Sequence, residues 1–149
     1  MRIHAILLLT TLLLAALAAL TGANAPESDA AGRFLGGWVN DEYNLYIRRD
    51  DDGIAGRLSQ AEGDHAWEFS GGYYDADKAR LYFLDCIRYR EYIDLDTLEL
   101  VQEDWSMSDL VFTWLALAGD GDALTAGDIP GIEAPLALRR VSDEEYFGF

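Results

Sequence analysis

Residues 43–54, with the sequence YNLYIRRDDDGI, decide the fold class of this chain. Tyr43, Leu45 and Ile47 alternate with more polar neighbours, which is the period-two pattern of a half-buried β-strand. The acidic turn at 50–53 follows, and a second apolar run begins directly after its glycine. A strand, a turn and a second strand within so few residues predict antiparallel β structure.

The same pattern continues along the chain and predicts further strands. The expected strands are 34–48, 54–59, the alternating run around Trp67, 81–93 (one bent strand or two short ones), 98–105, 110–117 and 135–141. The segment most open to a helical turn is 122–127, inside a long connection at 119–135 that is able to fold over a barrel mouth. Turn signals about 8–12 residues apart favour an all-β fold. We predict a single antiparallel meander of about eight strands closed as a small barrel, with a β-sandwich as the alternative.

The first 25 residues have the features of a signal peptide. A short positive start precedes an Ala/Leu run of roughly 15 residues, shorter than the roughly 20 needed to span a bilayer. Small residues at 23–25 predict cleavage after Ala25, a periplasmic or secreted location, and no transmembrane segment after cleavage. The remaining divisions are a flexible lead-in at 26–33, the barrel domain at 34–141 and an acidic-aromatic tail at 142–149. This tail is either a docking peptide or, as the default for a terminus, disordered.

Charge and cysteine content narrow the classes of partner. The net charge of −16 disfavours binding to nucleic acids and to anionic membranes, and favours solubility or an attraction to cationic partners or divalent ions. Cys86 is the single cysteine, so no intramolecular disulfide is possible. Its apolar setting predicts a buried, unreactive thiol rather than inter-chain pairing, and we expect a monomer.

The segment GGWVN at 36–40 resembles the G-x-W entry of lipocalin and avidin-type barrels, which are calycin-type folds. The resemblance implies that Gly36 and Trp38 close one end of a barrel, with a basic residue of the last strand, Arg139 or Arg140, stacked across the indole. Residues 52–56 also resemble the turn and second strand of avidin-like proteins.

Functional residues carry over from that resemblance only in part. Asn40 falls where avidins place a ligand-contacting Asn, but Leu58 and Gln60 stand where their Tyr and Ser would fall. The chain is also similar to uncharacterised secreted bacterial domains with a G-x-W, a later W-x-F and a terminal L-T-W-type strand. That similarity covers most of the chain and implies no activity.

Catalytic and metal chemistry find little support in the sequence. Outside the signal peptide, His65 is the single histidine and is expected beside a turn, so neither a nucleophilic triad nor a zinc site is indicated. We expect no enzymatic activity and no cofactor. Two acidic turns are weak calcium candidates, because their spacing does not match an EF-hand. These candidates are Asp50, Asp52, Asp120 and Asp122.

Aromatic and basic residues supply the tentative ligand site. We expect Trp67, Phe69, Phe112 and Trp114 to share the inward side of the barrel. The candidate ligand-binding residues are Trp67, Phe69, Arg88, Arg90 and Trp114. The leading hypothesis is a secreted, non-catalytic barrel that holds a small ligand. The alternative is an envelope interaction or inhibitor protein that acts through its surface or its C-terminal tail, which predicts a filled barrel and an exposed apolar patch.

Overall fold

The computed structural model describes residues 30–105 and 112–148. Within these ranges the chain forms nine strands followed by a short helix. They are β1 (Gly36–Val39), β2 (Tyr43–Asp50), β3 (Gly53–Gln60), β4 (His65–Asp75), β5 (Arg80–Ile93), β6 (Leu100–Trp105), β7 (Trp114–Leu117), β8 (Ala123–Gly127), β9 (Leu136–Val141) and α3 (Asp143–Phe147).

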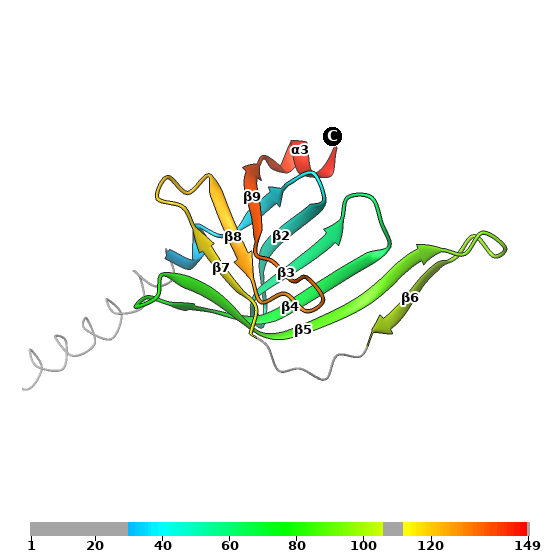
Figure 1. Ribbon diagram of the computed structural model, residues 1–149, viewed down its shortest axis with the longest axis horizontal. Coiled ribbons are helices and arrows are strands. Elements are labelled where there is room, and N and C mark those ends of the chain that lie inside the picture. The colour runs from blue at the N-terminus through cyan, green and yellow to red at the C-terminus, as the bar shows by residue number, and fades with distance from the viewer. Residues whose placement is uncertain (1–29, 106–111, 149) are drawn as a thin grey trace, which may run out of the picture.

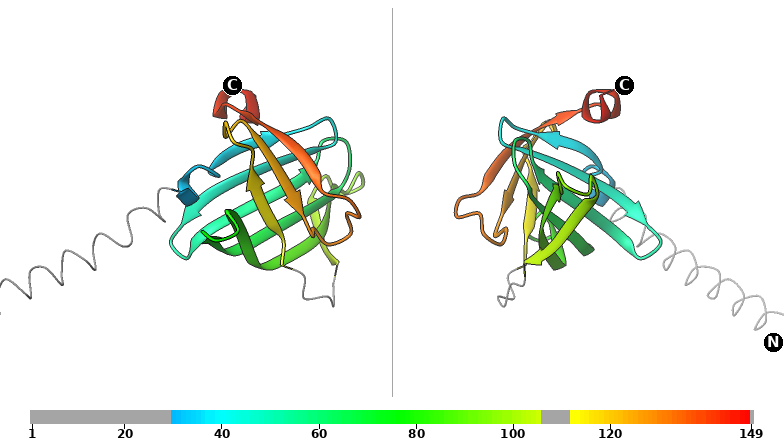
Figure 2. Two further views of the ribbon diagram at one scale, coloured as in Figure 1. Left: turned by 60° about the vertical axis from the view of Figure 1, so that its left-hand side comes forward. Right: turned by 90° about the vertical axis from the view of Figure 1, so that its right-hand side faces the viewer.

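Eight of these strands close into a barrel, as Figures 1 and 2 show. Each strand from β1 to β5 pairs antiparallel with the next, then β5 pairs with β7, β7 with β8, β8 with β9, and β9 returns to β1. The extra strand, β6, pairs with the far half of β5, and together they extend away from the barrel. The prediction of an all-β meander closed as a barrel is therefore confirmed.

The expected strand at 34–48 is wrong, because it is two strands joined by a tight turn. The Asn40 side chain makes this turn, since its Oδ1 accepts hydrogen bonds from the backbone N–H groups of Glu42 at 2.9 Å and Tyr43 at 2.7 Å. An Asx turn of this kind reverses the chain without glycine or proline. The absence of those two residues hid the hairpin from the sequence pattern.

The expected connection at 119–135 contains a strand, β8, where the sequence indicated a helical turn. Leu124 and Ala126 are buried and alternate with the exposed Thr125, so the period-two pattern is present but short. Pairing with both β7 and β9 holds this segment extended. Two other boundaries also differ: the strand expected at 98–105 begins at Leu100, and the one expected at 110–117 begins at Trp114, with 106–111 outside the described residues.

The strand β5 is continuous, but its inward side changes along its length. Leu81 and Phe83 face the core before the change, and Arg88 faces inward after it, over the buried ring of Trp67. The change occurs where Gly71 of β4, at φ 64°, drops out of the pairing register with β5. Strict alternation along the sequence therefore misplaces one half of this strand.

Both chain ends of the described domain pack onto the barrel. Residues 30–32 are helical, and Ala31 is buried in the core cluster. At the other end the tail is helical in α3, whose N-cap Ser142 accepts the N–H of Glu145 at 3.1 Å. The predicted signal peptide at 1–25 lies outside the described residues. Among the residues that are described, none belongs to a helix long and apolar enough to cross a membrane.

Candidate functional site

One end of the barrel is closed around Trp38. Its ring is fully buried, and its Nε1 donates to the Phe34 carbonyl at 2.8 Å. The Arg140 guanidinium lies over this ring at 4.1 Å and donates to the carbonyls of Leu35 and Arg33. Cation–π stacking with backbone hydrogen bonds ties β9 to the entry of the chain, so this end is structural.

The other two residues of the expected closure lie beside this stack. Gly36 has a φ of 105°, a conformation that favours glycine, and lies next to the Arg140 side chain. Arg139 points away from Trp38 and pairs with Glu145 of α3 at 2.8 Å. Of the two candidate basic residues, Arg140 is the one that stacks on the indole.

The opposite end is covered by the β8–β9 loop, residues 128–135. Trp67 donates from its Nε1 to the Pro130 carbonyl at 2.8 Å, and Ile129 is buried in the core cluster. Arg88 lies over the Trp67 ring at 5.4 Å and contacts the backbone at Gly131. The candidate residues Trp67 and Arg88 are thus brought together, but beneath a loop that packs on them.

Of the remaining ligand candidates, one joins this group. Phe69 is buried and stacks on Phe83 in the barrel interior, with ring centroids 5.3 Å apart. Trp114 does not join them: β7 pairs with β5 so that Leu115 is buried opposite Leu81, which turns Trp114 outward. There the Trp114 ring stacks with Arg80 at 4.0 Å. The expected inward position of Trp114 is therefore wrong, and so is that of the exposed Phe112.

Arg90, the fifth candidate, lies in an ion-pair network at the base of the β5–β6 hairpin. It pairs with the carboxylate of Asp64, and this hydrogen bond lowers the pKa of Asp64 below its ordinary value. His65 also contacts Asp64, with Nδ1 3.0 Å from Oδ1. On the hairpin itself the Tyr92 hydroxyl donates to Glu103 at 2.9 Å. These contacts join the hairpin to β4 and fix its direction.

A second set of contacts supports the opposite face of the hairpin. Glu91 of β5 accepts from Arg57 of β3 at 2.8 Å and from Gln102 of β6 at 2.8 Å. Polar contacts therefore brace both faces of the hairpin where it leaves the barrel, and we infer that it projects as a rigid arm.

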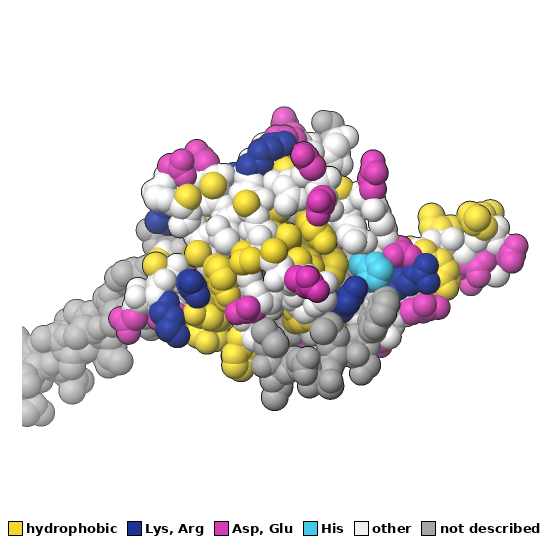
Figure 3. All heavy atoms as spheres, viewed as in Figure 1, with side chains coloured by type: hydrophobic (Ala, Val, Ile, Leu, Met, Phe, Trp, Pro, Cys, Tyr) yellow, Lys and Arg dark blue, Asp and Glu magenta, His cyan; other side chains and the backbone are white. Residues whose placement is uncertain are grey.

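The end of this arm carries an apolar patch that the sequence analysis did not identify. We define the hairpin tip as Ile93, Leu95, Leu98 and Leu100, whose exposed fractions are 60%, 85%, 77% and 62%. Figure 3 shows apolar and acidic side chains together over the projecting hairpin. The signal in the sequence was the run IDLDTLEL at 93–100, where each leucine alternates with a polar residue in the manner of an ordinary strand.

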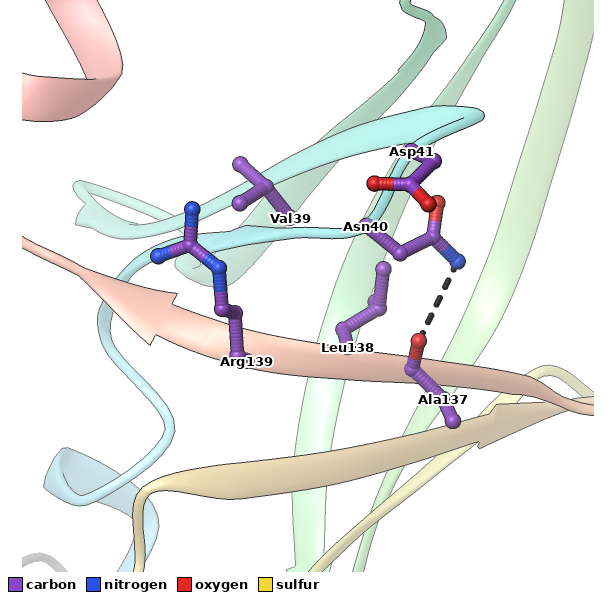
Figure 4. Close-up of a pocket in the computed structure, with 6 residues that line it drawn as sticks. All are labelled: Val39, Asn40, Asp41, Ala137, Leu138 and Arg139. Atoms are coloured by element: carbon purple, nitrogen blue, oxygen red, sulfur yellow. Dashed lines mark hydrogen bonds between the residues drawn. The ribbon is translucent and has the colours of Figure 1, made fainter.

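A shallow groove of ≈ 400 Å³ lies at the β1–β9 seam, as Figure 4 shows. Asn40 lines it and donates from Nδ2 to the Ala137 carbonyl at 3.1 Å. The same side chain also makes the β1–β2 turn. The asparagine that avidins use for ligand contact is therefore structural in this chain.

The acidic turns are explained by their own hydrogen bonds. Asp50 Oδ1 accepts the Asp52 N–H at 3.1 Å, and Asp120 Oδ1 accepts the Asp122 N–H at 3.1 Å. These are Asx turns, which acidic residues form without metal. Within 30–105 and 112–148, no cluster of three or more His, Cys, Asp or Glu side chains is arranged to hold a metal ion.

No protein-family model, curated protein or solved structure matches this chain. The fold assignment therefore rests on the strand pairing, and the functional assignment rests on the surfaces described above.

Proposed function

We propose that this chain is an exported, non-catalytic binding protein that contacts a protein partner through the hairpin tip. The eight-stranded barrel is compatible with calycin-like binding and, in this proposal, acts as the rigid support of the arm. The predicted signal peptide places the encounter in the periplasm or outside the cell.

The observation that carries the proposal is the exposure of the four aliphatic side chains of the tip. Each has 60% or more of its surface in water, and they are adjacent because Ile93 lies opposite Leu100 across the hairpin. Burying one such side chain in a partner is worth about 1.5–3 kcal/mol. Contiguous exposed apolar groups surrounded by polar residues are typical of protein interaction sites.

The backbone at Leu98 adds a second reason. Leu98 has φ 58°, a left-handed conformation that favours glycine or asparagine, and its side chain is 77% exposed. In the isolated chain this leucine adds strain and buries little surface. A partner that covers the side chain accounts for a leucine at this position.

A small ligand inside the barrel is the second candidate, and the pair of Arg88 and Trp67 favours it. A guanidinium over an indole would suit an anionic ligand with an apolar body. Such a ligand would have to displace the 128–135 loop, because Pro130 and Gly131 contact this pair. Native mass spectrometry of protein purified gently from its own host separates the candidates, since a stoichiometric small-molecule adduct supports the lumen.

Site-specific photocrosslinking in the producing organism tests the partner proposal. A photoreactive residue in place of Leu95 is expected to yield one defined product with a second protein. The same residue at Thr125, exposed on the barrel wall, is the matched control and is expected to yield none.

The product at position 95 should also disappear when Leu98→Asp is added, because a charge at the tip opposes apolar contact. No product at position 95, or the same product at both positions, contradicts the proposal.

A further inference from the structure

We propose that the outer edge of β6 accepts an extended, lysine- or arginine-rich segment of the partner as an added antiparallel strand. This inference rests on the proposed function, since it assumes that the arm is where the partner binds. It goes further by naming the chemistry of the occupant and the atoms that receive it.

The first observation is that β6 pairs on one side only among the described residues, where its single neighbour is β5. An antiparallel ladder alternates hydrogen-bonded and non-bonded pairs. Asp94 donates its N–H to the Glu99 carbonyl at 2.9 Å, whereas the Glu91 N–H turns away from β6 to the Asp64 carbonyl at 2.6 Å. The alternation then directs the backbone groups of three β6 residues away from β5. These residues are Leu100, Gln102 and Asp104.

The second observation is the charge around this edge. Six of the fourteen residues from 91 to 104 are acidic and none is basic. Glu103 and Asp104 are exposed on β6 itself, one on each face of the strand. An incoming strand with lysine or arginine near these carboxylates gains charge-assisted contacts, and apolar residues beside Leu100 and Val101 continue the hairpin tip.

The same charges decide against a second copy of this chain. Two β6 edges side by side would bring two acidic arms together in a molecule with a net charge of −16. Charged side chains on an edge strand are a known device against self-pairing. Repulsion between like edges and attraction for a basic strand together give specificity.

The test uses a synthetic nine-residue peptide, KVTVKVTVK, and a control peptide with glutamate in place of each lysine. Amide hydrogen exchange of the purified protein is measured by NMR with and without each peptide. The lysine peptide is expected to slow exchange about tenfold at Leu100, Gln102 and Asp104, and the glutamate peptide to have no effect. Equal protection by both peptides, or protection by neither, overturns the inference.

Two variants locate the effect. Gln102→Pro removes an outward N–H from an edge strand, where proline is tolerated, and should abolish the protection. Glu99→Lys with Asp104→Lys should weaken peptide binding about tenfold, whereas the same charge change at Asp51 and Asp52, on the β2–β3 turn, should leave it unchanged. Equal weakening by both charge pairs would mean that general attraction replaces strand addition.

Two further outcomes keep this inference separate from the proposed function. Protection that rises with protein concentration alone, without peptide, would identify a second copy as the occupant and overturn the inference. If the edge takes no peptide while the crosslink at position 95 persists, the tip contact stands and strand addition is wrong. If the crosslink is absent as well, the proposed function itself fails.

Discussion

At the scale of single residues, the molecule separates structural aromatic residues from exposed apolar ones. Trp38 and Trp67 are buried, and each donates its indole N–H to a backbone carbonyl at 2.8 Å. Buried tryptophan needs such a partner, because an unpaired polar group in the core is costly. The hairpin tip follows the opposite rule, since its aliphatic groups remain in water.

Trp38→Ala should lower the free energy of unfolding by about 3–5 kcal/mol, because it removes a fully buried ring and the surface on which Arg140 stacks. Urea unfolding followed by circular dichroism measures the loss. Leu95→Ala, at an exposed position, is the control and should change stability by less than about 0.5 kcal/mol. A loss below about 1 kcal/mol for Trp38→Ala would show that this stack does not hold the barrel closed.

Cys86 should react slowly with iodoacetamide in the folded protein at pH 8. Burial, with a smaller contribution from the neighbouring Asp85, raises the pKa of this thiol to about 12, so little thiolate is present. Mass spectrometry after timed alkylation should show fast labelling in urea and slow labelling without it. Comparable rates in the two conditions would contradict the burial of Cys86.

At the scale of elements, the β5–β6 hairpin is the part whose role differs most from its neighbours. The near half of β5 belongs to the barrel wall, and the far half pairs with β6 to form the arm. Long side chains brace its base, while its turn contains a leucine in a conformation suited to glycine. The arm thus combines a rigid base with a strained apolar end, which is the pattern expected of a recognition element.

Leu98→Gly should raise the free energy of unfolding by about 1 kcal/mol, because glycine adopts φ 58° without steric cost. The same substitution at Leu95, which is not in the left-handed region, should leave stability unchanged or lower it. Thermal and urea unfolding of the two variants provide the comparison. Both variants should weaken the crosslinked complex, so a gain in stability would accompany a loss of binding. A lower stability for Leu98→Gly would contradict the assignment of strain.

At the scale of the whole molecule, a strongly acidic chain is held together by a filled barrel core and by arginines in selected places. Arg140 binds one end, Arg88 lies under the opposite loop, and Arg57 braces the arm. Tyrosines packed near these positions have pKa values above the ordinary value of 10.0. Stability at high pH is therefore a property of the whole surface and not of one site.

Stability should fall between pH 10 and pH 12. Burial raises the pKa of Tyr89 to about 12, and the negative charges of Glu68 and Glu91 add to this rise against the opposing effect of Arg57. Because the folded pKa lies above the unfolded value, this stabilisation is complete below pH 10 and is lost as the pH rises through 12.

Urea midpoints measured from pH 8 to pH 12 test the prediction about Tyr89. Tyr89→Phe should start lower at pH 8, because it loses the hydrogen bond to Glu68 at 3.2 Å, but should show a smaller fall. An equal fall in both proteins would assign the effect to other tyrosines, such as Tyr46 and Tyr146.

The sequence by itself determined the class of the fold and several of its turns. Alternation in 43–47 and the acidic turn at 50–53 are local signals, because side-chain direction and turn conformation depend on neighbouring residues. The stacking partner of Trp38 was narrowed to Arg139 or Arg140 through the resemblance to known barrels. These inferences required no knowledge of distant contacts.

Only the tertiary structure decided the rest. β8 is a strand because β7 and β9 pair with it, Trp114 faces outward because Leu115 lies against Leu81, and the β1–β2 turn depends on the hydrogen bonds of one asparagine. The hairpin tip looked like ordinary strand sequence, since a local pattern does not reveal whether a leucine meets a core or water. That outcome depends on which segments lie opposite one another in space, and barrel closure fixes this through contacts between residues far apart in the chain.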